Sequence, residues 1–395
     1  MEIVKTILHQ MPNVAQPQVK FMLVLLPLLM CLRGRTNFRN LSRYSDYHEK
    51  TFSRWYRRHF DFVEFNRLSL LPLCEAAQTT LIAATDCSFV SKSGKHTEGL
   101  GKFYNGVQGK TEKGLEISTL AVVNVTENTA YNLSTRQTAA TGNNDETRVD
   151  GYLDHLKQDR HALPLQIRYL VADGYYSKKK YIDGVAALDL YQIGKLRHDA
   201  NLRWLYLGEQ KPRGRKRRYD GKVKLDELSR FEAVGEWDGL HIYTAVVNSA
   251  HFNRDLRIVY LVKQVGHQVQ TALLFSTDLS LDAKTLVCYY KARFQIEFLF
   301  RDAKQFLGLN HCQARCSQAL HFHFNASMTA LNLLKLEDRQ HQSGGGKVIS
   351  IASWKIRKAN AHLLERFSAY LGLDFSLIKS RPDFEQLCNY GAIAA

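Results

Sequence analysis

A short segment in the last third of the chain gathers one carboxylate and several groups suited to holding phosphates. It reads YYKARFQIEFLFRDAKQF over residues 289–306 and contains neither Gly nor Pro. Its apolar residues recur at helical spacing, which predicts one helix. At about 100° per residue, four polar side chains share the face of Glu297: Tyr290, Arg293, Arg301 and Lys304. The opposite face is apolar and would pack on a core through Ala292, Ile296, Leu299, Ala303 and Phe306.

This polar face supports two interpretations. In the first it is an ordinary solvated surface, on which Glu297 and Arg301 form an i,i+4 ion pair that stabilises the helix only slightly. In the second, Glu297 is a metal ligand among phosphate-binding groups, because Arg offers a planar fork and Lys a point charge. The second interpretation requires further carboxylates elsewhere in the chain.

Two aspartates upstream meet that requirement. Residues 81–90, LIAATDCSFV, predict a buried strand that carries Asp86, and residues 166–176, QIRYLVADGYY, predict a strand that ends at Asp173. Asp173 precedes Gly174, so a role as turn residue or helix cap is the alternative. Asp86 is less easily explained that way, since an isolated charge in a buried strand is costly unless it is paired or metal-bound. Three carboxylates can hold two Mg²⁺ ions for an in-line displacement at a phosphodiester.

The order of the surrounding elements indicates the fold class. Further strands are predicted at residues 115–125 and 131–138, with a Gly-rich turn region at residues 91–114 between the first two strands. A helix separates the third strand from the one that ends at Asp173, and another helix follows. Strand, strand, strand, helix, strand, helix is the order of a mixed α/β layer fold, in which active residues tend to sit at strand ends.

Composition limits the kind of partner and compartment. The chain has 395 residues, enough for two or three domains, and a formal net charge of +16, which favours a nucleic acid over a membrane as partner. Seven cysteines without a repeating pattern suit a reducing compartment. A structural zinc site is disfavoured by spacing at Cys312, Cys316, His321 and His323. The apolar run at residues 21–32 is too short to span a bilayer and predicts a buried helix. No targeting segment is visible, so a cytoplasmic protein, nucleoid-associated when bound to DNA, is expected.

Two basic segments are candidates for contact with DNA. The first seventy residues look helical, and a predicted helix at residues 47–60 would place Arg54, Arg57 and Arg58 on one face of a helix-turn-helix. The alternative is a basic helical bundle that touches no DNA. Residues 211–222, KPRGRKRRYDGK, form a second basic stretch that includes Arg215, Lys216, Arg217 and Arg218. It is interpreted as a clamp on the DNA backbone, with a merely solvated loop as the alternative.

Taken together, these residues resemble those of DDE transposases of the insertion-sequence-four type. The family signature Y-x2-R-x3-E-x6-K is met without deviation by Tyr290, Arg293, Glu297 and Lys304. Asp86 stands in a T-D-x-S setting followed by Lys92 and Gly94, and Asp173 stands in A-D-G-Y-Y. The resemblance covers about residues 81–316.

The resemblance implies a structure and a set of roles. It implies an RNase H-like mixed sheet flanked by helices, with an inserted β-rich domain before the last catalytic helix. Asp86, Asp173 and Glu297 would be the catalytic metal ligands for Mg²⁺ or Mn²⁺, while Tyr290, Arg293 and Lys304 would hold phosphates of the transposon end. Arg301 is added to the DNA-binding set only because it shares their face.

The expected division of the chain follows from the same pattern. Several alternating or β-branched runs within residues 223–276 suit the inserted domain. The expected parts are a helical N-terminal DNA-binding domain at 1–72, the first part of the catalytic core at 75–190, the inserted domain at 191–281, the last core helices at 282–340 and a C-terminal helical region at 341–395.

The function implied is that of a transposase that binds terminal inverted repeats. It would hydrolyse the transposon ends and join the 3′-hydroxyls to target DNA, acting on double-stranded DNA as a homodimer. Two alternatives stay open: a metal-dependent nuclease on the same core that never joins strands, and a non-catalytic DNA-binding protein derived from a transposase. Trp237 lies in the expected inserted domain, but its spacing assigns it no role.

Overall fold

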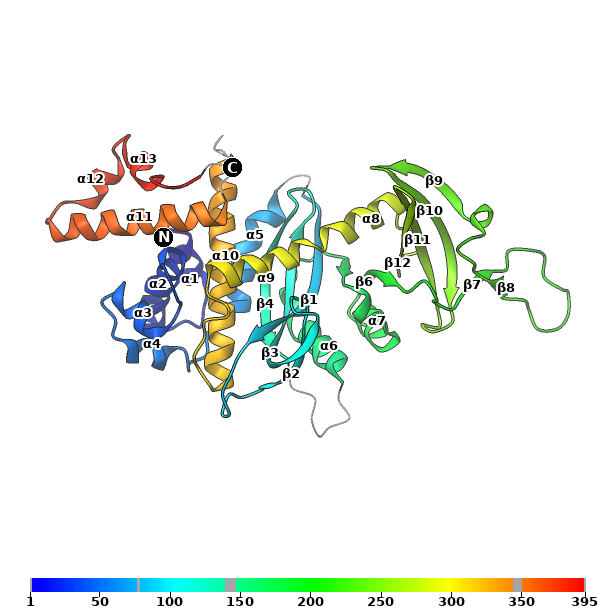
Figure 1. Cartoon of the computed structure of the whole chain (residues 1–395), viewed down its shortest axis with the longest axis horizontal. Coiled ribbons are helices and arrows are strands. Elements are labelled where there is room, and N and C mark those ends of the chain that lie inside the picture. Colours follow the sequence, from blue (N-terminus) through cyan, green and yellow to red (C-terminus); the bar gives the residue numbers. More distant parts are fainter. Residues whose placement is uncertain (1, 77–78, 139–146, 344–349, 394–395) are drawn as a thin grey trace.

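The computed structural model describes residues 2–76, 79–138, 147–343 and 350–393. Figure 1 shows three parts side by side along the long axis. Helices from both ends of the chain lie on one side, a mixed sheet with its helices occupies the centre, and a β-rich part lies on the other side. The predicted mixed α/β class is therefore confirmed.

The central sheet combines antiparallel and parallel strands. β1 (Leu81–Ser91) pairs antiparallel with β3 (Lys110–Asn124), which pairs antiparallel with β4 (Thr129–Gln137). On the other side of β1, β5 (Tyr169–Val171) and then β6 (Tyr191–Leu196) continue the sheet in parallel. This arrangement fits the RNase H-like core that the resemblance implies. It places the middle of β1, which carries Asp86, near the end of β5, which Asp173 follows two residues later.

The prediction of a Gly-rich turn region between the first two strands was wrong in one respect. It contains β2 (Gly101–Asn105), which forms a hairpin with the first residues of β3 and pairs Asn105 with Lys110. Only Phe103 of the strand's five residues is buried. The strand therefore has no need of a run of apolar residues, and its sequence contains none that would predict it. Its existence depends on pairing with β3, which local pattern alone does not reveal.

Both faces of the central sheet are buried, because alternate side chains of a strand point to opposite faces. On one face, Ile82 and Ala84 join a core formed with helices α2 (Gln16–Cys31), α8 (Ala283–Ala292), α9 (Gln295–Phe306) and α10 (Ser317–Ser343). On the other, Leu81 and Ala83 join a core formed with α6 (Arg148–Asp159) and α7 (Lys179–Ala186). This two-sided burial explains why β1 is apolar without alternation.

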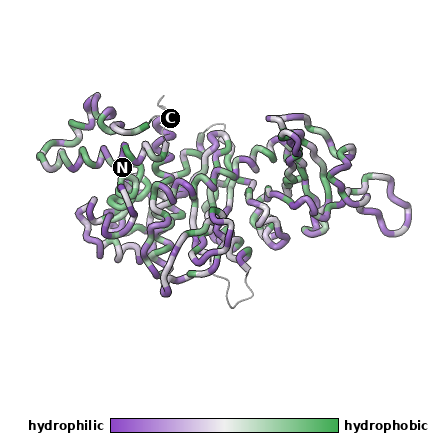
Figure 2. Tube along the Cα trace, in the orientation of Figure 1, coloured by the Kyte–Doolittle hydropathy of each residue, from purple (hydrophilic) through white to green (hydrophobic). Residues whose placement is uncertain are grey.

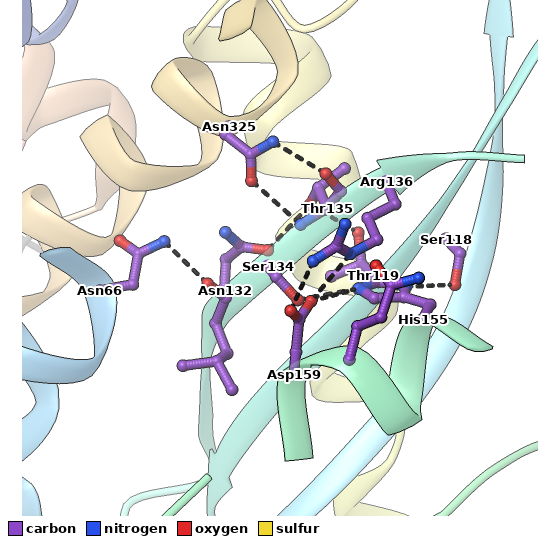
Figure 3. A network of polar contacts seen from close by, with 12 residues as sticks. Asn66, Ser118, Thr119, Asn132, Ser134, Thr135, Arg136, His155, Asp159 and Asn325 are labelled. Atoms are coloured by element: carbon purple, nitrogen blue, oxygen red, sulfur yellow. Dashed lines mark hydrogen bonds and ion pairs between the residues drawn. The ribbon is translucent and has the colours of Figure 1, made fainter. Parts of the chain in front are cut away.

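The free edge of β4 is covered by asparagines of α10. Asn325 donates from Nδ2 to the carbonyl of Thr135 at 2.8 Å and accepts from its N–H at 3.0 Å (Figure 3). Asn332 bonds in the same way to Asn132, at 2.7 and 2.8 Å. The two side-chain amides take the place of a neighbouring strand, which satisfies the edge and protects it from pairing with another chain.

A buried polar network fixes α6 against the sheet (Figure 3). Arg136 of β4 donates two hydrogen bonds to Asp159, from Nη2 to Oδ1 at 2.5 Å and from Nε to Oδ2 at 3.0 Å. His155 lies between Ser118 and Ser134, at 2.9 and 2.8 Å. Burial lowers the pKa of His155, although the adjacent Asp159 opposes the shift. The network holds β3 and β4 in register behind β1.

The β-rich part continues the same sheet rather than forming a separate one. β12 (Gln268–Ser276) pairs antiparallel with β6, so the sheet has twelve strands among the described residues. Its own core includes Trp204, Phe231 and Phe275. The four predicted β runs within residues 223–276 are present, and two further strands precede them. The strands are β7 (Leu202–Leu205), β8 (Tyr219–Lys222), β9 (Glu232–Trp237), β10 (Leu240–Ser249), β11 (Arg254–Val265) and β12 (Gln268–Ser276).

The helical part is built from helices of both the N-terminal and the C-terminal region of the chain. The predicted buried helix is α2, whose apolar residues lie in the interior of this part (Figure 2). Within the described ranges, no helix has both the length and the apolar character needed to cross a membrane. The other N-terminal helices are α1 (Glu2–Gln10), α3 (Phe38–Arg43), α4 (Glu49–Trp55) and α5 (Phe62–Glu75). The C-terminal helices are α11 (Ile351–Tyr370), α12 (Phe375–Lys379) and α13 (Phe384–Cys388).

Candidate active site

The signature segment forms two helices, not the single helix predicted from its spacing. α8 ends at Ala292 and α9 begins at Gln295, with Arg293 and Phe294 between them. At this joint the backbone tightens to i→i+3 bonds, from Ile296 N to Arg293 O at 3.0 Å and from Glu297 N to Phe294 O at 3.1 Å. Tyr290 therefore belongs to α8, whereas Glu297 and Lys304 belong to α9.

The predicted core side of the segment is largely confirmed. Ala292, Ile296, Leu299 and Ala303 are all buried. Phe306, predicted with them, is only partly buried. The opposite side is accessible at Glu297, whose side chain is 47% exposed.

Arg293 connects two of the three predicted carboxylates. Its Nη2 lies 3.0 Å from Glu297 Oε1, and its Nη1 lies 3.8 Å from Asp86 Oδ2. The side chain is only 7% exposed, and its Nε has no hydrogen-bond partner among the described residues. Burial alone would lower the pKa of Arg293, but Tyr290 and the two carboxylates outweigh it and raise that pKa. A permanent positive charge therefore stands at the carboxylates.

Arg301 does not pair with Glu297, contrary to the ion pair considered from the sequence. Its guanidinium turns to the adjacent Asp302, with 2.9 Å between Nη2 and Oδ1, and lies over the ring of Phe298. Spacing on a helix brings Cα atoms to one face, but the rotamer decides which group a long side chain reaches. Glu297 forms its ion pair with Arg293 instead of Arg301.

Asp86 and Asp173 share one cavity. The cavity has a volume of about 360 Å³ and is also lined by Lys304. Asp86 Oδ1 accepts from the N–H of Cys87 at 2.8 Å. Burial, and then the charge of Asp173, raise the pKa of Asp86 to about 7, although Arg293 opposes the shift. The two aspartates are therefore close enough to repel each other.

Asp173 is also a cap, as the alternative interpretation held. Its Oδ1 accepts from Tyr175 N at 2.9 Å and so begins the short 3₁₀ turn η2 (Gly174–Tyr176). That bond uses one carboxylate oxygen and fixes the side chain at the end of β5. Capping and a place in the cavity are thus compatible.

Lys304 reaches from α9 to the strand of Asp86. Its Nζ donates to Ser88 Oγ at 2.8 Å, and burial lowers the pKa of its amine. Ser88 is the serine of the T-D-x-S setting. The bond brings a cation of α9 into the cavity beside the aspartates.

The carboxylates of this site, in the arrangement seen here, match only part of the ligand set that a hard divalent cation needs. Carboxylate oxygens are the ligands that Mg²⁺ prefers, and a cation would relieve the repulsion that raises the pKa of Asp86. Within the part of the chain that the structure describes, however, no three His, Cys, Asp or Glu side chains lie close enough together to hold a metal ion. Asp86 and Asp173 offer carboxylate oxygens to such an ion from one cavity, while Oε1 of Glu297 is taken by Arg293.

The cavity holds residues that the sequence did not single out. Glu116 of β3 and Tyr152 of α6 line it, and Tyr152 donates to Glu116 Oε1 at 2.5 Å. Arg148, Tyr104 and Tyr175 line it as well. A charge inside the apolar run of residues 115–125 was the one signal that pointed to Glu116.

The predicted basic face on the N-terminal helix is not formed as expected. α4 ends at Trp55, so only Arg54 lies on it, while Arg57 and Arg58 follow in a turn. All three side chains are exposed, and Arg58 stacks on Trp55 at 4.4 Å from the ring centre. The cations remain close in sequence, but they do not share one helical face.

The basic stretch at residues 211–218 forms an exposed loop between β7 and β8, which projects from the far end of the β-rich part (Figure 1). Arg217 is held by Asp220 at 2.5 Å and lies over the ring of Tyr206. Arg215, Lys216 and Arg218 are exposed, and within the described ranges their side chains have no protein partner. These three cations of the loop are therefore available to a ligand.

Trp237 lies closer to the signature than its spacing suggested. It ends β9 at a tight hairpin turn whose two residues, Asp238 and Gly239, both have positive φ. Lys291 of α8 lies 4.5 Å from the centre of the Trp237 ring and 3.6 Å from Asp238 Oδ2. The hairpin tip thus touches the residue that follows Tyr290.

Comparison with known proteins places the chain in a family. One solved structure similar to this one is a piggyBac transposase synaptic complex with hairpin DNA, at a TM-score of 0.43 and 11% sequence identity, covering 97% of this chain and 81% of that chain. No curated protein matches. Residues 86–333 match the family model of the transposase DDE domain. That match spans more than half of the chain, and it begins at Asp86 and includes Asp173 and Glu297. The chain belongs to the family of transposases with a DDE domain.

Proposed function

We propose that this chain is a cut-and-paste transposase of the insertion-sequence-four type. It binds the terminal inverted repeats of its element, hydrolyses the phosphodiester at each end and joins the resulting 3′-hydroxyls to target DNA. The observation that carries the proposal is the shared cavity of Asp86 and Asp173, with Lys304 in it and the Arg293–Glu297 pair against Asp86.

Asp86, Asp173 and Glu297 are the proposed ligands of Mg²⁺, with Mn²⁺ as a substitute. Domains of this family generally use divalent metals. When bound, such ions activate the attacking water or hydroxyl and stabilise the leaving oxygen. Asp173 is held for this role by its bond to Tyr175, and Asp86 by its bond to Cys87. Glu297 joins them once Arg293 releases it.

Arg293 and Lys304 are proposed to hold the phosphates on either side of the bond that is cut. Both are largely buried, so their charges are weakly screened by solvent. Without DNA, Arg293 neutralises Glu297 and Asp86. A DNA phosphate offers it a bidentate acceptor instead, and transfer of Arg293 to that phosphate frees the carboxylates. Tyr290 packs beside Arg293 and limits the directions in which its guanidinium can turn.

Double-stranded DNA is proposed to contact several exposed basic groups outside the cavity. They are Arg54, Arg57 and Arg58 near α4, Arg301 on α9, and Arg215, Lys216, Arg217 and Arg218 in the loop between β7 and β8. The division into an N-terminal DNA-binding domain, a split catalytic core with a β-rich insertion and a C-terminal helical region remains part of this proposal. A homodimer on DNA is also proposed, because two ends must be brought together. A cytoplasmic location is proposed as well.

The test is a cleavage and joining assay. Purified protein is mixed with a labelled duplex that carries the element's own end, taken from DNA flanking the gene, in Mg²⁺ or EDTA. Mg²⁺-dependent nicking at the element boundary followed by joining to a plasmid supports the proposal. Scattered cutting without joining favours a nuclease on the same core, and tight end binding without cutting favours a derived DNA-binding protein.

A further inference from the structure

Lys92, which follows the T-D-x-S setting of Asp86, is not among the residues that line the cavity of the aspartates. It comes directly after β1, which ends at Ser91, and its side chain is half-buried. Its Nζ donates to the backbone carbonyl of Cys312, and burial lowers the pKa of its amine. Lys92 therefore uses its donor inside the protein, on the loop that follows α9.

This loop has little regular structure of its own. α9 ends at Phe306, and residues 311–316 belong to no helix or strand. Backbone carbonyls in such a segment need partners from elsewhere, because an unpaired buried polar group is costly. The carbonyl of Cys312 has Lys92 as its partner. The position of the loop therefore depends in part on the residue that extends β1.

A second link joins the same two segments. The N–H of Glu98 donates to the carbonyl of Arg315 at 2.9 Å, and its Oε2 accepts from Ser317 N at 2.7 Å, where α10 begins. A carboxylate is favourable at this end of a helix. Gly94, with a φ of +111°, lets the chain turn between Lys92 and Glu98. The segment after β1 is thus joined at several points to the segment after α9.

These links bear on the catalytic carboxylates because α9 carries Glu297. The apolar side of α9 packs through contacts that have no preferred direction, so hydrogen bonds must fix how the helix lies along β1. Lys304 supplies one of them, to Ser88 Oγ at 2.8 Å. In the proposed function Lys304 moves to a DNA phosphate, which breaks that bond. The bond from Lys92 to Cys312 is then the charged link that remains between β1 and the end of α9.

We infer that Lys92 is a positioning residue that keeps α9 in register with β1 while Lys304 holds DNA. It acts through Cys312 and α9 on the distance between Glu297 and Asp86, and not by contact with the substrate. A misplacement of ~1 Å at a catalytic group can lower the rate about a hundredfold. The inference rests on the proposed function, since it concerns the state in which DNA is bound.

The first test follows amide hydrogen exchange of the full chain in EDTA, with and without a duplex that carries the transposon end. Lys92→Met keeps an unbranched side chain but removes the donor. It should raise exchange of residues 303–312 several-fold in the complex, and less in the free chain, where Lys304 still bonds to Ser88. Lys92→Arg keeps a charged donor and should stay close to wild type. Lys95→Met, which removes an exposed lysine of the same segment, is the matched control.

The second test is nicking of the transposon end at increasing Mg²⁺. Lys92→Met should bind the end within about twofold of wild type but nick it about tenfold or more slowly. It should also need several times more Mg²⁺ for half of its maximal rate, because Glu297 no longer lies in place for the ion. Lys92→Arg should recover most of the rate and of the Mg²⁺ dependence.

A second variant decides the question if Lys92→Met does not fold. Glu98→Ala removes the bond to Ser317 N at an exposed position, so the chain should fold. It should raise the Mg²⁺ requirement and the exchange of residues 303–312 in the complex, in the same direction as Lys92→Met. A folded Glu98→Ala that matches wild type in both measurements would then overturn the inference.

The outcomes separate this inference from the proposed function. If wild type cuts and joins transposon ends, and Lys92→Met exchanges and nicks as wild type does, the inference is overturned and the transposase stands. Weaker end binding by Lys92→Met at an unchanged Mg²⁺ requirement would make Lys92 a DNA contact, which also overturns the positioning role. Failure of wild type itself to bind and cut transposon ends would overturn both.

Discussion

The guanidinium of Arg293 lies 3.0 Å from the carboxylate of Glu297, one helical turn away across the joint between α8 and α9. Asp86 lies on its other side at 3.8 Å. Arg293 is thus an internal counter-cation between two acids of a transposase DDE domain. In our account it must give up these contacts when DNA phosphate and metal ions arrive, so the arginine and the glutamate change partners together.

Replacing the arginine tests this exchange. Arg293→Ala is expected to lower transposon-end binding by about tenfold, because a phosphate contact is lost, and to lower cleavage by a larger factor. Band-shift titration and a nicking time course measure the two effects. Arg381→Ala, which removes an exposed arginine in the C-terminal region, should change neither. A variant that binds as wild type and only cuts slowly would remove Arg293 from the phosphate contacts.

Neutralising the glutamate should separate binding from cutting. Glu297→Gln keeps the shape of the side chain but removes a ligand charge, so end binding should remain within about twofold while cleavage falls by at least about a hundredfold. Glu232→Gln, at an exposed position on β9, is the matched control. Cleavage at the wild-type rate by Glu297→Gln would show that this carboxylate is not part of the metal site.

The raised pKa of Asp86 predicts a pH-dependent cost of folding without metal. Its pKa is about 7 in the folded chain, against about 3.9 for an unperturbed aspartate. The folded state then binds more protons than the unfolded state between these values, so the contribution of Asp86 to stability falls as pH rises from about 4 to 7. Above pH 7 the cost is constant and of order 4 kcal/mol.

Asp86→Asn should remove that cost. In EDTA the variant should have a higher free energy of unfolding than wild type at pH 8, and the difference should shrink as pH approaches 4. Urea unfolding at pH 8, 6 and 4 measures it, and effects of the substitution that do not depend on pH cancel in the comparison. Mg²⁺ at pH 8 should stabilise wild type more than the variant. A difference independent of pH would contradict the raised pKa of Asp86.

The exposed loop between β7 and β8 should bind DNA through charge. The triple variant Arg215→Ala, Lys216→Ala, Arg218→Ala should weaken binding to any duplex, and the slope of log K against log salt should fall by up to about 3. Arg217 is left in place because it is held by Asp220 and Tyr206. Removing Arg366, Lys379 and Arg381 together, which also takes three exposed cations from the chain, is the control. An unchanged salt slope would mean that the loop is solvated and makes no contact with DNA.

Much of the fold was visible in local pattern. β1 and β12 contain continuous or alternating apolar runs, and the buried side of α9 follows from the spacing of Ile296, Leu299 and Ala303. Asp86 interrupts a buried strand, where a charge needs an explanation. These features depend on residues close in sequence, and the structure confirms them.

The features that were missed depend on contacts between distant segments or on rotamers. β2 exists because β3 pairs with it, and its own residues do not predict a strand. The break at Arg293 and the turn of Arg301 toward Asp302 are choices of backbone and rotamer among alternatives of similar energy. Tyr104 and Glu116 reach the cavity of Asp173 only through the order of strands in the sheet. No local pattern contains that order.

The most direct test of the central claim is metal-specific cleavage by Asp173→Cys at the element boundary. Mg²⁺ strongly prefers oxygen ligands, and Mn²⁺ accepts a thiolate more readily. If Asp173 holds the catalytic ion, the variant should fail to nick the transposon end in Mg²⁺ and regain part of its activity in Mn²⁺. Asp226→Cys, at an exposed position in the β-rich part, should cut normally with either ion. Nicking by Asp173→Cys in Mg²⁺ at the wild-type rate would contradict the account.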